Sequence, residues 1–341
     1  MSNKNINQIF EALTPRTEQK EKSIHNILMQ SQVVHKRQRR IPPMRPVRYA
    51  VLATVLMVCV TTTAFAAAYM GLDEAFIKFL KPANNEQTEY LSNGAYVVDK
   101  TVENDYGSLT IKQVIGDGNL TYILMDFTAP EGTVLNATRY RFHTSITTNE
   151  SFHGTGFEVL DDENPNDNKI SLVMNIMTDR SLAGQTVDLK LYDLQAADPF
   201  PGIFETIIPG PWETNFKLDF KEYSTFYQID QSFTMFGYKA ILNTISVSPI
   251  SIALKINSGS LKEINDASRS KEIGPNEYLD NFPITINYKD GTSETTSIFT
   301  GLAKSDLLSN QLLTIKTFEN VINDKEITSI VFFDKKIPIN K

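Results

Sequence analysis

Residues 49–72, YAVLATVLMVCVTTTAFAAAYMGL, are 24 consecutive positions without a charged side chain. They follow directly on a basic run at residues 35–48, HKRQRRIPPMRPVR. At about 1.5 Å of rise per residue, a helix of this length would span about 36 Å, enough to cross a hydrocarbon core of about 30 Å. A buried helix of a soluble protein is usually shorter and rarely follows so dense a basic block. The junction therefore predicts a transmembrane signal anchor over residues 49–72.

The charge of the chain changes sign across this stretch. Residues 1–48 hold ten Lys and Arg residues against three acids, a net charge of +7, whereas the whole chain carries −7, so residues 49–341 carry −14. Lys and Arg beside a span are retained on the cytoplasmic side. We therefore expect a single-pass protein of the cell membrane with residues 1–48 in the cytoplasm and residues 73–341 outside.

A secretory signal peptide is the main alternative for the apolar stretch. Ala64, Phe65 and Ala66 precede Ala67 in a small-x-small pattern, and residues 51–63 would serve as the apolar core. The basic region before it would be 48 residues long, however, and signal peptides usually total about 15–30 residues. This length favours an uncleaved anchor, with Ala64, Ala66 and Ala67 as a possible cleavage site.

The cytoplasmic segment contains two short patterns at helical spacing. Thr14 and Pro15 between them are typical of a helix N-terminus. Two amphipathic helices in 48 residues bury too little surface to be stable alone. The anionic membrane surface, the other helix or a partner protein must cover their apolar stripes. Nucleic-acid binding is disfavoured, because neither aromatic interleaving nor helix-turn-helix spacing is present. The hypothetical partner-docking residues are Ile6, Ile9, Phe10, Leu13, Ile24, Ile27 and Leu28.

The external part has the pattern of β-structure after one short helix, which we expect over residues 73–81 before Pro82. Turn signals such as Asn93-Gly94, residues 104–107 and residues 116–119 separate short runs rich in β-branched and aromatic residues. In the run 120–127, Ile123, Met125 and Phe127 share one face, which predicts a half-buried strand. Further runs lie at residues 96–98, 109–111, 170–177, 186–191 and 216–220.

A second unit is expected to begin after Lys221. Residues 245–256 alternate on both sides of Pro249, where the apolar parity changes, so a bend, bulge or strand switch is expected at Ser248-Pro249. A strand at 284–288 leads into an Asp-Gly turn, and the last strand covers 327–333. Residues 304–313 are the one expected helix or helical turn of this region. We predict a mainly β protein with two external β-sandwich, immunoglobulin-like domains over residues 73–221 and 222–341.

The inventory of reactive side chains is small. Cys59, the single cysteine, lies in the predicted span, and only His143 and His153 lie beyond it. No metal-ligand spacing is present, and residues 151–156, SFHGTG, lack a nucleophile elbow and are better explained as a polar hairpin turn. Trp212 is expected to be a packing anchor rather than a ligand platform. We therefore predict no enzymatic activity, no catalytic residues, no bound metal and no cofactor.

The acidic stretch DDENPNDN at residues 161–168 leaves two interpretations open. Clustered carboxylates and amides suit Ca²⁺, but the glycine and terminal glutamate of the EF-hand loop are missing. A solvated loop between strands is the simpler interpretation.

Several segments together resemble a group of Gram-positive bacterial membrane proteins. They are TP at 14–15 with EQKEK at 18–22, GLDEAF at 71–76, NGAYVVDK at 93–100 and LTIKQV at 109–114. Residues 245–256 resemble the immunoglobulin-like domain that often follows the external domain of unknown function in this group. Several members are regarded as anti-sigma factors for extracytoplasmic-function sigma factors. The group has no catalytic motif, and the zinc-binding His/Cys pattern of one anti-sigma class is absent here, so any sigma contact would be zinc-free.

The resemblance implies a regulatory function, in which external domains sense an unknown extracytoplasmic ligand while residues 1–48 hold a sigma factor inactive. The alternative is a non-catalytic envelope or adhesion module that its N-terminal helix merely anchors. Whether the neighbouring gene encodes a sigma factor would discriminate between the two.

Overall fold

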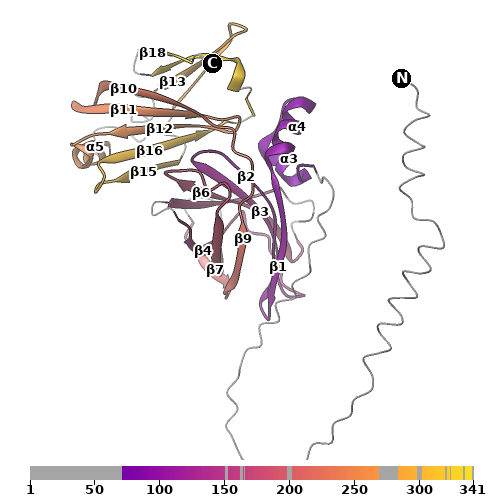
Figure 1. Cartoon of the computed structure of the whole chain (residues 1–341). Helices are drawn as coiled ribbons and strands as arrows, with labels where there is room; N and C mark the ends of the chain where they lie inside the picture. The colour runs from indigo at the N-terminus through magenta and orange to yellow at the C-terminus, as the bar shows by residue number, and fades with distance from the viewer. Residues whose placement is uncertain are drawn as a thin grey trace, which may run out of the picture. The chain divides into compact units, whose positions relative to one another are not determined.

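The computed structural model describes residues 71–339 apart from 150–152, 162–163, 165, 198–201, 269–282, 298–301, 319–320, 323 and 333–334 (Figure 1). The described chain is mainly β and all of its strand pairs are antiparallel, which confirms the predicted class. Within these residues, no helix has both the length and the apolar character that crossing a membrane requires. The predicted cytoplasmic segment, the residues proposed to dock a partner, the cleavage site and nearly all of the predicted span lie outside the described residues.

The first pair of sheets encloses one core, as expected for a β-sandwich. One sheet has the order β1-β2-β3-β6-β5, and the other has the order β4-β7-β8 with β9 also on β7. Trp212 is fully buried between them, with its ring centroid 5.0 Å from that of Phe127, which confirms its role in packing. The strands are β1 (Tyr96–Asn104), β2 (Gly107–Gly116), β3 (Leu120–Thr128), β4 (Arg139–Thr147), β5 (His153–Val159), β6 (Lys169–Thr178), β7 (Thr186–Ala197), β8 (Glu205–Ile208) and β9 (Trp212–Lys217).

The second pair of sheets has its own core. Its sheets have the orders β10-β11-β12-β16-β15 and β14-β13-β17-β18. The predicted bend at Ser248-Pro249 is a tight turn between β11 and β12, and the predicted Asp-Gly turn joins β13 to β14, with Gly291 at φ +86°. The strands are β10 (Thr225–Met235), β11 (Tyr238–Val247), β12 (Ser251–Asn257), β13 (Pro283–Tyr288), β14 (Ser293–Ser297), β15 (Leu302–Asp306), β16 (Gln311–Thr317), β17 (Ile327–Phe332) and β18 (Lys335–Pro338).

Strand β3 is buried on both faces, so the prediction of a half-buried strand is wrong. Ile123, Met125 and Phe127 face the first core, while Tyr122 and Leu124 belong to a third apolar cluster. That cluster also contains side chains from helix α3 (Glu74–Leu80), from α4 (Asn85–Gly94) and from the second pair of sheets, namely Ile250, Ala253, Leu313 and Ile315. The face of β3 that the sequence assigned to solvent is therefore covered by the two helices that precede the sheet and by later parts of the chain.

The helix or helical turn predicted over residues 304–313 is wrong as a helix. These residues form the end of β15, a turn at 307–310 and the start of β16, and Leu308 in the turn is 97% exposed. The exposed Leu308 happens to lie at helical spacing from the neighbouring apolar residues, which is why the sequence suggested a helix. The real helix of this region is α5 (Leu261–Ser268), followed later by a short 3₁₀ turn, η2 (Asp324–Glu326). Residues 153–156 are likewise not a turn but the beginning of β5.

Candidate functional site

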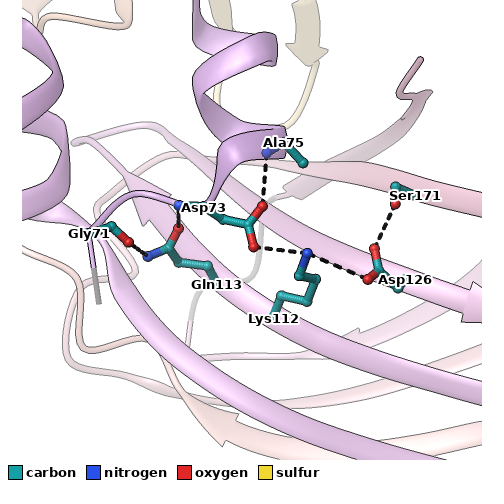
Figure 2. Close-up of polar contacts among 7 residues, drawn as sticks. All are labelled: Gly71, Asp73, Ala75, Lys112, Gln113, Asp126 and Ser171. Atoms are coloured by element: carbon teal, nitrogen blue, oxygen red, sulfur yellow. Dashed lines mark hydrogen bonds and ion pairs between the residues drawn. The ribbon is translucent and has the colours of Figure 1, made fainter. Parts of the chain in front are cut away.

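The first described residues, Gly71, Leu72 and Asp73, which we call the stem, are held tightly against strand β2. The side-chain amide of Gln113 accepts a hydrogen bond from Asp73 N at 2.8 Å and donates one to Gly71 O at 3.3 Å (Figure 2). Gln113 is only 3% exposed, so these are well-shielded contacts. The Leu72 N–H donates to Ser92 Oγ in α4 at 3.0 Å. The backbone of the stem is therefore hydrogen-bonded to β2 on one side and to α4 on the other.

Asp73 connects the stem to helix α3 and to the sheet at once. As the N-cap residue, it accepts a hydrogen bond from Ala75 N on Oδ1 at 2.8 Å, which satisfies one of the free donors of the first helical turn. Its other oxygen, Oδ2, lies 2.8 Å from Lys112 Nζ (Figure 2). Lys112 also lies 3.5 Å from Asp126 on β3, whose carboxylate accepts a hydrogen bond from Ser171 on β6 at 2.7 Å.

The charge of Lys112 is stabilised by this arrangement. Partial burial alone would lower the pKa of Lys112, but its hydrogen bond to Asp73 and the charges of Asp126 and Asp73 together raise that pKa above its ordinary value. The ammonium group therefore remains charged at physiological pH and joins two carboxylates from different elements. We call Asp73, Lys112, Gln113 and Asp126 the stem clamp.

A β-bulge brings two neighbouring side chains of β2 into the stem clamp. The register of β2 shifts between Ile111 and Gln113 against β3, so Lys112 has no opposite residue there. In a regular strand, adjacent side chains point to opposite faces, but a bulge re-aims one of them. Ile111 and Val114 both face the first core, which leaves Lys112 and Gln113 together on the other side.

Helix α3 packs its apolar face into the cluster shared by both pairs of sheets. Phe76 is fully buried and Leu80 is 7% exposed, while Leu72 of the stem is 7% exposed in the same cluster. The helix ends at Lys81, which adopts a left-handed conformation with φ 50°. The stem is therefore attached to the folded body by apolar burial as well as by the stem clamp.

A buried polar contact joins the two pairs of sheets beside this cluster. In the β2–β3 turn, Asp117 is 3% exposed and its Oδ1 accepts from the backbone N–H groups of Asn119 and Leu120. Its Oδ2 accepts from the hydroxyl groups of Ser248 at 2.7 Å and Ser251 at 2.5 Å, in the β11–β12 turn. Each oxygen of this buried carboxylate therefore accepts two hydrogen bonds, which compensates for its removal from water.

The residues that the sequence singled out for ions or chemistry do not form a site in the described structure. His143 is exposed on β4, and His153 is the first residue of β5. In the acidic loop, Asp167 accepts hydrogen bonds from Lys169 N and from Asn164, and Asn168 donates to Ala129 O. Residues 162, 163 and 165 of that loop lie outside the described residues. Among those described, no three His, Cys, Asp or Glu side chains are grouped to hold a metal ion.

Sequence reasoning missed the stem clamp, although one signal for it exists. The apolar positions of β2 change parity between Ile111 and Val114, which predicts a bulge at residues 112–113. Nothing in the sequence shows that Lys112 forms an ion pair with Asp73, which lies far from it along the chain.

Comparison with known proteins gives limited information. No protein-family model matches the chain, and no curated protein matches it. A solved structure described as a conserved domain protein from Bacillus anthracis is similar, with 15% identity, a TM-score of 0.49 and coverage of 71% of this chain and 77% of that one. Another is the N-terminal periplasmic domain of ScsB from Proteus mirabilis, with 9% identity, a TM-score of 0.20 and coverage of 73% of this chain and 98% of that one.

Proposed function

We propose that this chain is a single-pass membrane regulatory protein of the anti-sigma-factor type from a Gram-positive bacterium. In this proposal the part of the apolar stretch 49–72 that precedes the stem anchors the chain in the membrane. Residues 1–48 dock an extracytoplasmic-function sigma factor, and the two pairs of sheets are external sensing domains, the second one immunoglobulin-like. The support comes from the charge reversal around the apolar stretch, from the resemblance of the quoted segments and from the attachment of the stem.

The attachment of the stem is the observation that carries the proposal. Leu72, the last residue of the predicted span, is already buried in the folded body, and its backbone N–H is hydrogen-bonded to Ser92. A protein that is merely tethered needs only a flexible linker between its anchor and its domains. In the sequence, the apolar stretch runs into the stem without a Gly-, Ser- or Pro-rich segment, so in this proposal a change in the external body acts directly on the end of the span.

The same geometry favours release by proteolysis as the route of signalling. Gly71, the first described residue, follows Ala67 by only four positions, so a body clamped at the stem would shield the Ala64–Ala67 region from a protease. Thr61, Thr62 and Thr63 just before it are poor helix formers, which makes local unwinding easier once the body moves away.

The docking part of the proposal is tested by capture of an extracytoplasmic-function sigma factor, which the proposal expects the neighbouring gene to encode. The full-length chain in native membranes is expected to retain that sigma factor, and Phe10→Asp or Ile27→Asp is expected to abolish retention. An unpaired carboxylate in an apolar contact costs several kcal/mol, and every ~1.4 kcal/mol is tenfold in affinity. Gln8→Asp, which adds the same charge on the opposite side of the predicted helix, is the control. If all four proteins, the unsubstituted chain included, fail to retain the sigma factor, the anchored adhesion module is the better explanation.

A further inference from the structure

Strands β4 and β5 are consecutive in the chain but do not pair with each other. Strand β4 pairs with β7 and β5 pairs with β6, so each is an edge strand of a different sheet. Between them lies a groove with a volume of about 830 Å³, lined by residues 138–144 on one side and 155–159 on the other. We call it the edge groove.

The walls of the edge groove are suited to an extended polypeptide. An edge strand presents a row of N–H and C=O groups that can pair with a further strand. On the core side of the groove, Phe142 of β4 and Phe157 of β5 approach with ring centroids 5.8 Å apart. A strand added beside β4 would therefore place every second side chain over an apolar surface.

The other face of β4 carries two arginines at alternating positions. The guanidinium groups of Arg139 and Arg141 lie 5.0 and 4.1 Å from the centre of the Phe204 ring. They are oriented by hydrogen bonds, from Arg139 to Gly202 O at 2.9 Å and from Arg141 Nε to Gln195 Oε1 at 2.8 Å. Arg141 forms no ion pair with any carboxylate of the described residues. Guanidinium groups held in this way are pre-organised to bind carboxylates.

We propose that the edge groove binds an extended acidic peptide segment, which adds to β4 as a further strand. Residues two apart on a strand are separated by about 7 Å on one face, so with acidic side chains at alternate positions of the added strand one of them would lie beside Arg141. The side chains between them would be apolar and lie toward Phe142 and Phe157. Arg139 and Arg141 lie on the β4 side of the groove and Glu158 lies on the β5 side, so charge complementarity favours an acidic ligand along β4.

The inference goes beyond the proposed function, because binding at the edge groove requires neither a membrane anchor nor a sigma factor. A peptide is favoured over a polyanion without amide groups, because only a peptide backbone supplies the donors and acceptors that an open strand edge lacks.

Fluorescence anisotropy with the detergent-solubilised full chain tests the proposal. The probe is a labelled peptide of alternating Glu and Val, and the comparison peptides are one of alternating Glu and Pro, one of Glu alone and one of alternating Lys and Val. The Glu-Val peptide is expected to bind, whereas the Glu-Pro peptide, which lacks every second N–H donor, and the Lys-Val peptide are expected not to bind. Equal binding of the Glu-Val, Glu-Pro and Glu-only peptides would show that charge alone attracts them and would overturn strand addition.

The arginines are tested by one variant with a matched control. Arg141→Gln is expected to weaken binding of the Glu-Val peptide about tenfold or more. Arg180→Gln alters an exposed arginine that is not among the groove residues, and should leave the affinity unchanged. Binding of the peptide should slow the hydrogen exchange of the β4 amides, both in the unsubstituted chain and in Arg180→Gln. Unchanged affinity in Arg141→Gln, or no added protection of β4, would contradict the proposal.

Discussion

Asp117 and Ser248 are 131 positions apart in the chain, and the hydroxyl group of Ser248 donates a 2.7 Å hydrogen bond to the carboxylate of Asp117 in a buried site. Ser248 Oγ also accepts from the N–H groups of Ile250 and Ser251, so the β11–β12 turn is built around the same hydroxyl that contacts the β2–β3 turn. The two pairs of sheets are therefore joined by a contact that also maintains the conformation of both turns.

Asp117→Asn is expected to weaken this joint. The amide NH₂ would face Ser248 Oγ, whose lone pairs already accept two backbone N–H groups, so buried donors would be left without acceptors. Such a defect costs about 1–3 kcal/mol. Calorimetry should show one unfolding transition for the described body in the unsubstituted chain and two separated transitions in Asp117→Asn. Asp230→Asn, at an exposed aspartate that accepts from Gln228 and Asn243, is the control and should keep the single transition.

Lys112→Gln is expected to loosen the stem. Asp73 and Asp126 would lose their shared cation, and because all three side chains are partly exposed the loss should be on the order of 1 kcal/mol. Hydrogen exchange should become faster at the amides of α3, with a smaller increase at the amides of β12 and β16. Lys217→Gln, which removes an exposed ion pair with Asp219, should leave α3 unaffected. Unchanged exchange in α3 would mean that apolar burial and the hydrogen bonds of Gln113 and Ser92 hold the stem without the ion pairs of Lys112.

The sequence predicted best those elements whose cause is local. The short helix that ends before Pro82, the Asp-Gly turn before β14 and the alternation on either side of Pro249 are all read from neighbouring residues. Helix α4 was missed because Leu91 is its one buried large apolar residue, so no apolar stripe marks it. Asn84, whose side chain accepts a hydrogen bond from Gln87 N, is a local signal for the start of this helix. The pair Asn93-Gly94 at the other end suggested a turn instead.

Long-range features were not predictable in the same way. The burial of both faces of β3 depends on Ile250 and Leu313, which follow it by more than a hundred residues. The stem clamp depends on a bulge that turns Lys112 toward Asp73. The pattern of one strand carries no information about what covers its second face.

Stability should fall in alkaline solution above about pH 10, the ordinary pKa of tyrosine. Burial, with smaller contributions from the charges of Asp117 and Glu158, raises the pKa of Tyr122 despite its hydrogen bond to Thr317. Burial, together with Glu294 and Asp290, raises the pKa of Tyr288 to about 12. The folded state then keeps protons that the unfolded state has released, so the free energy of unfolding decreases as pH rises through this window. The raised pKa of Lys112 acts with the same sign.

Tyr122→Phe should reduce this pH dependence, because it removes a buried group that resists ionisation. Chemical unfolding at pH 8 and at successive values above pH 10 measures the slope, and Tyr106→Phe at an exposed position should leave it as in the unsubstituted chain. An identical slope in Tyr122→Phe would show that this tyrosine is accessible to hydroxide in the folded protein.

An immunoblot of the full chain tagged at both ends tests directly whether the external body controls cleavage near the end of the span. Unstressed cells should contain one 38.4 kDa membrane species, plus the mass of the tags. Under envelope stress, an external fragment that begins near Ala67 should appear. Ala66→Trp should block that fragment, and Lys112→Gln should produce it without stress. Finding only the shorter external form in unstressed cells would instead establish an ordinary secretory signal and contradict the regulatory function.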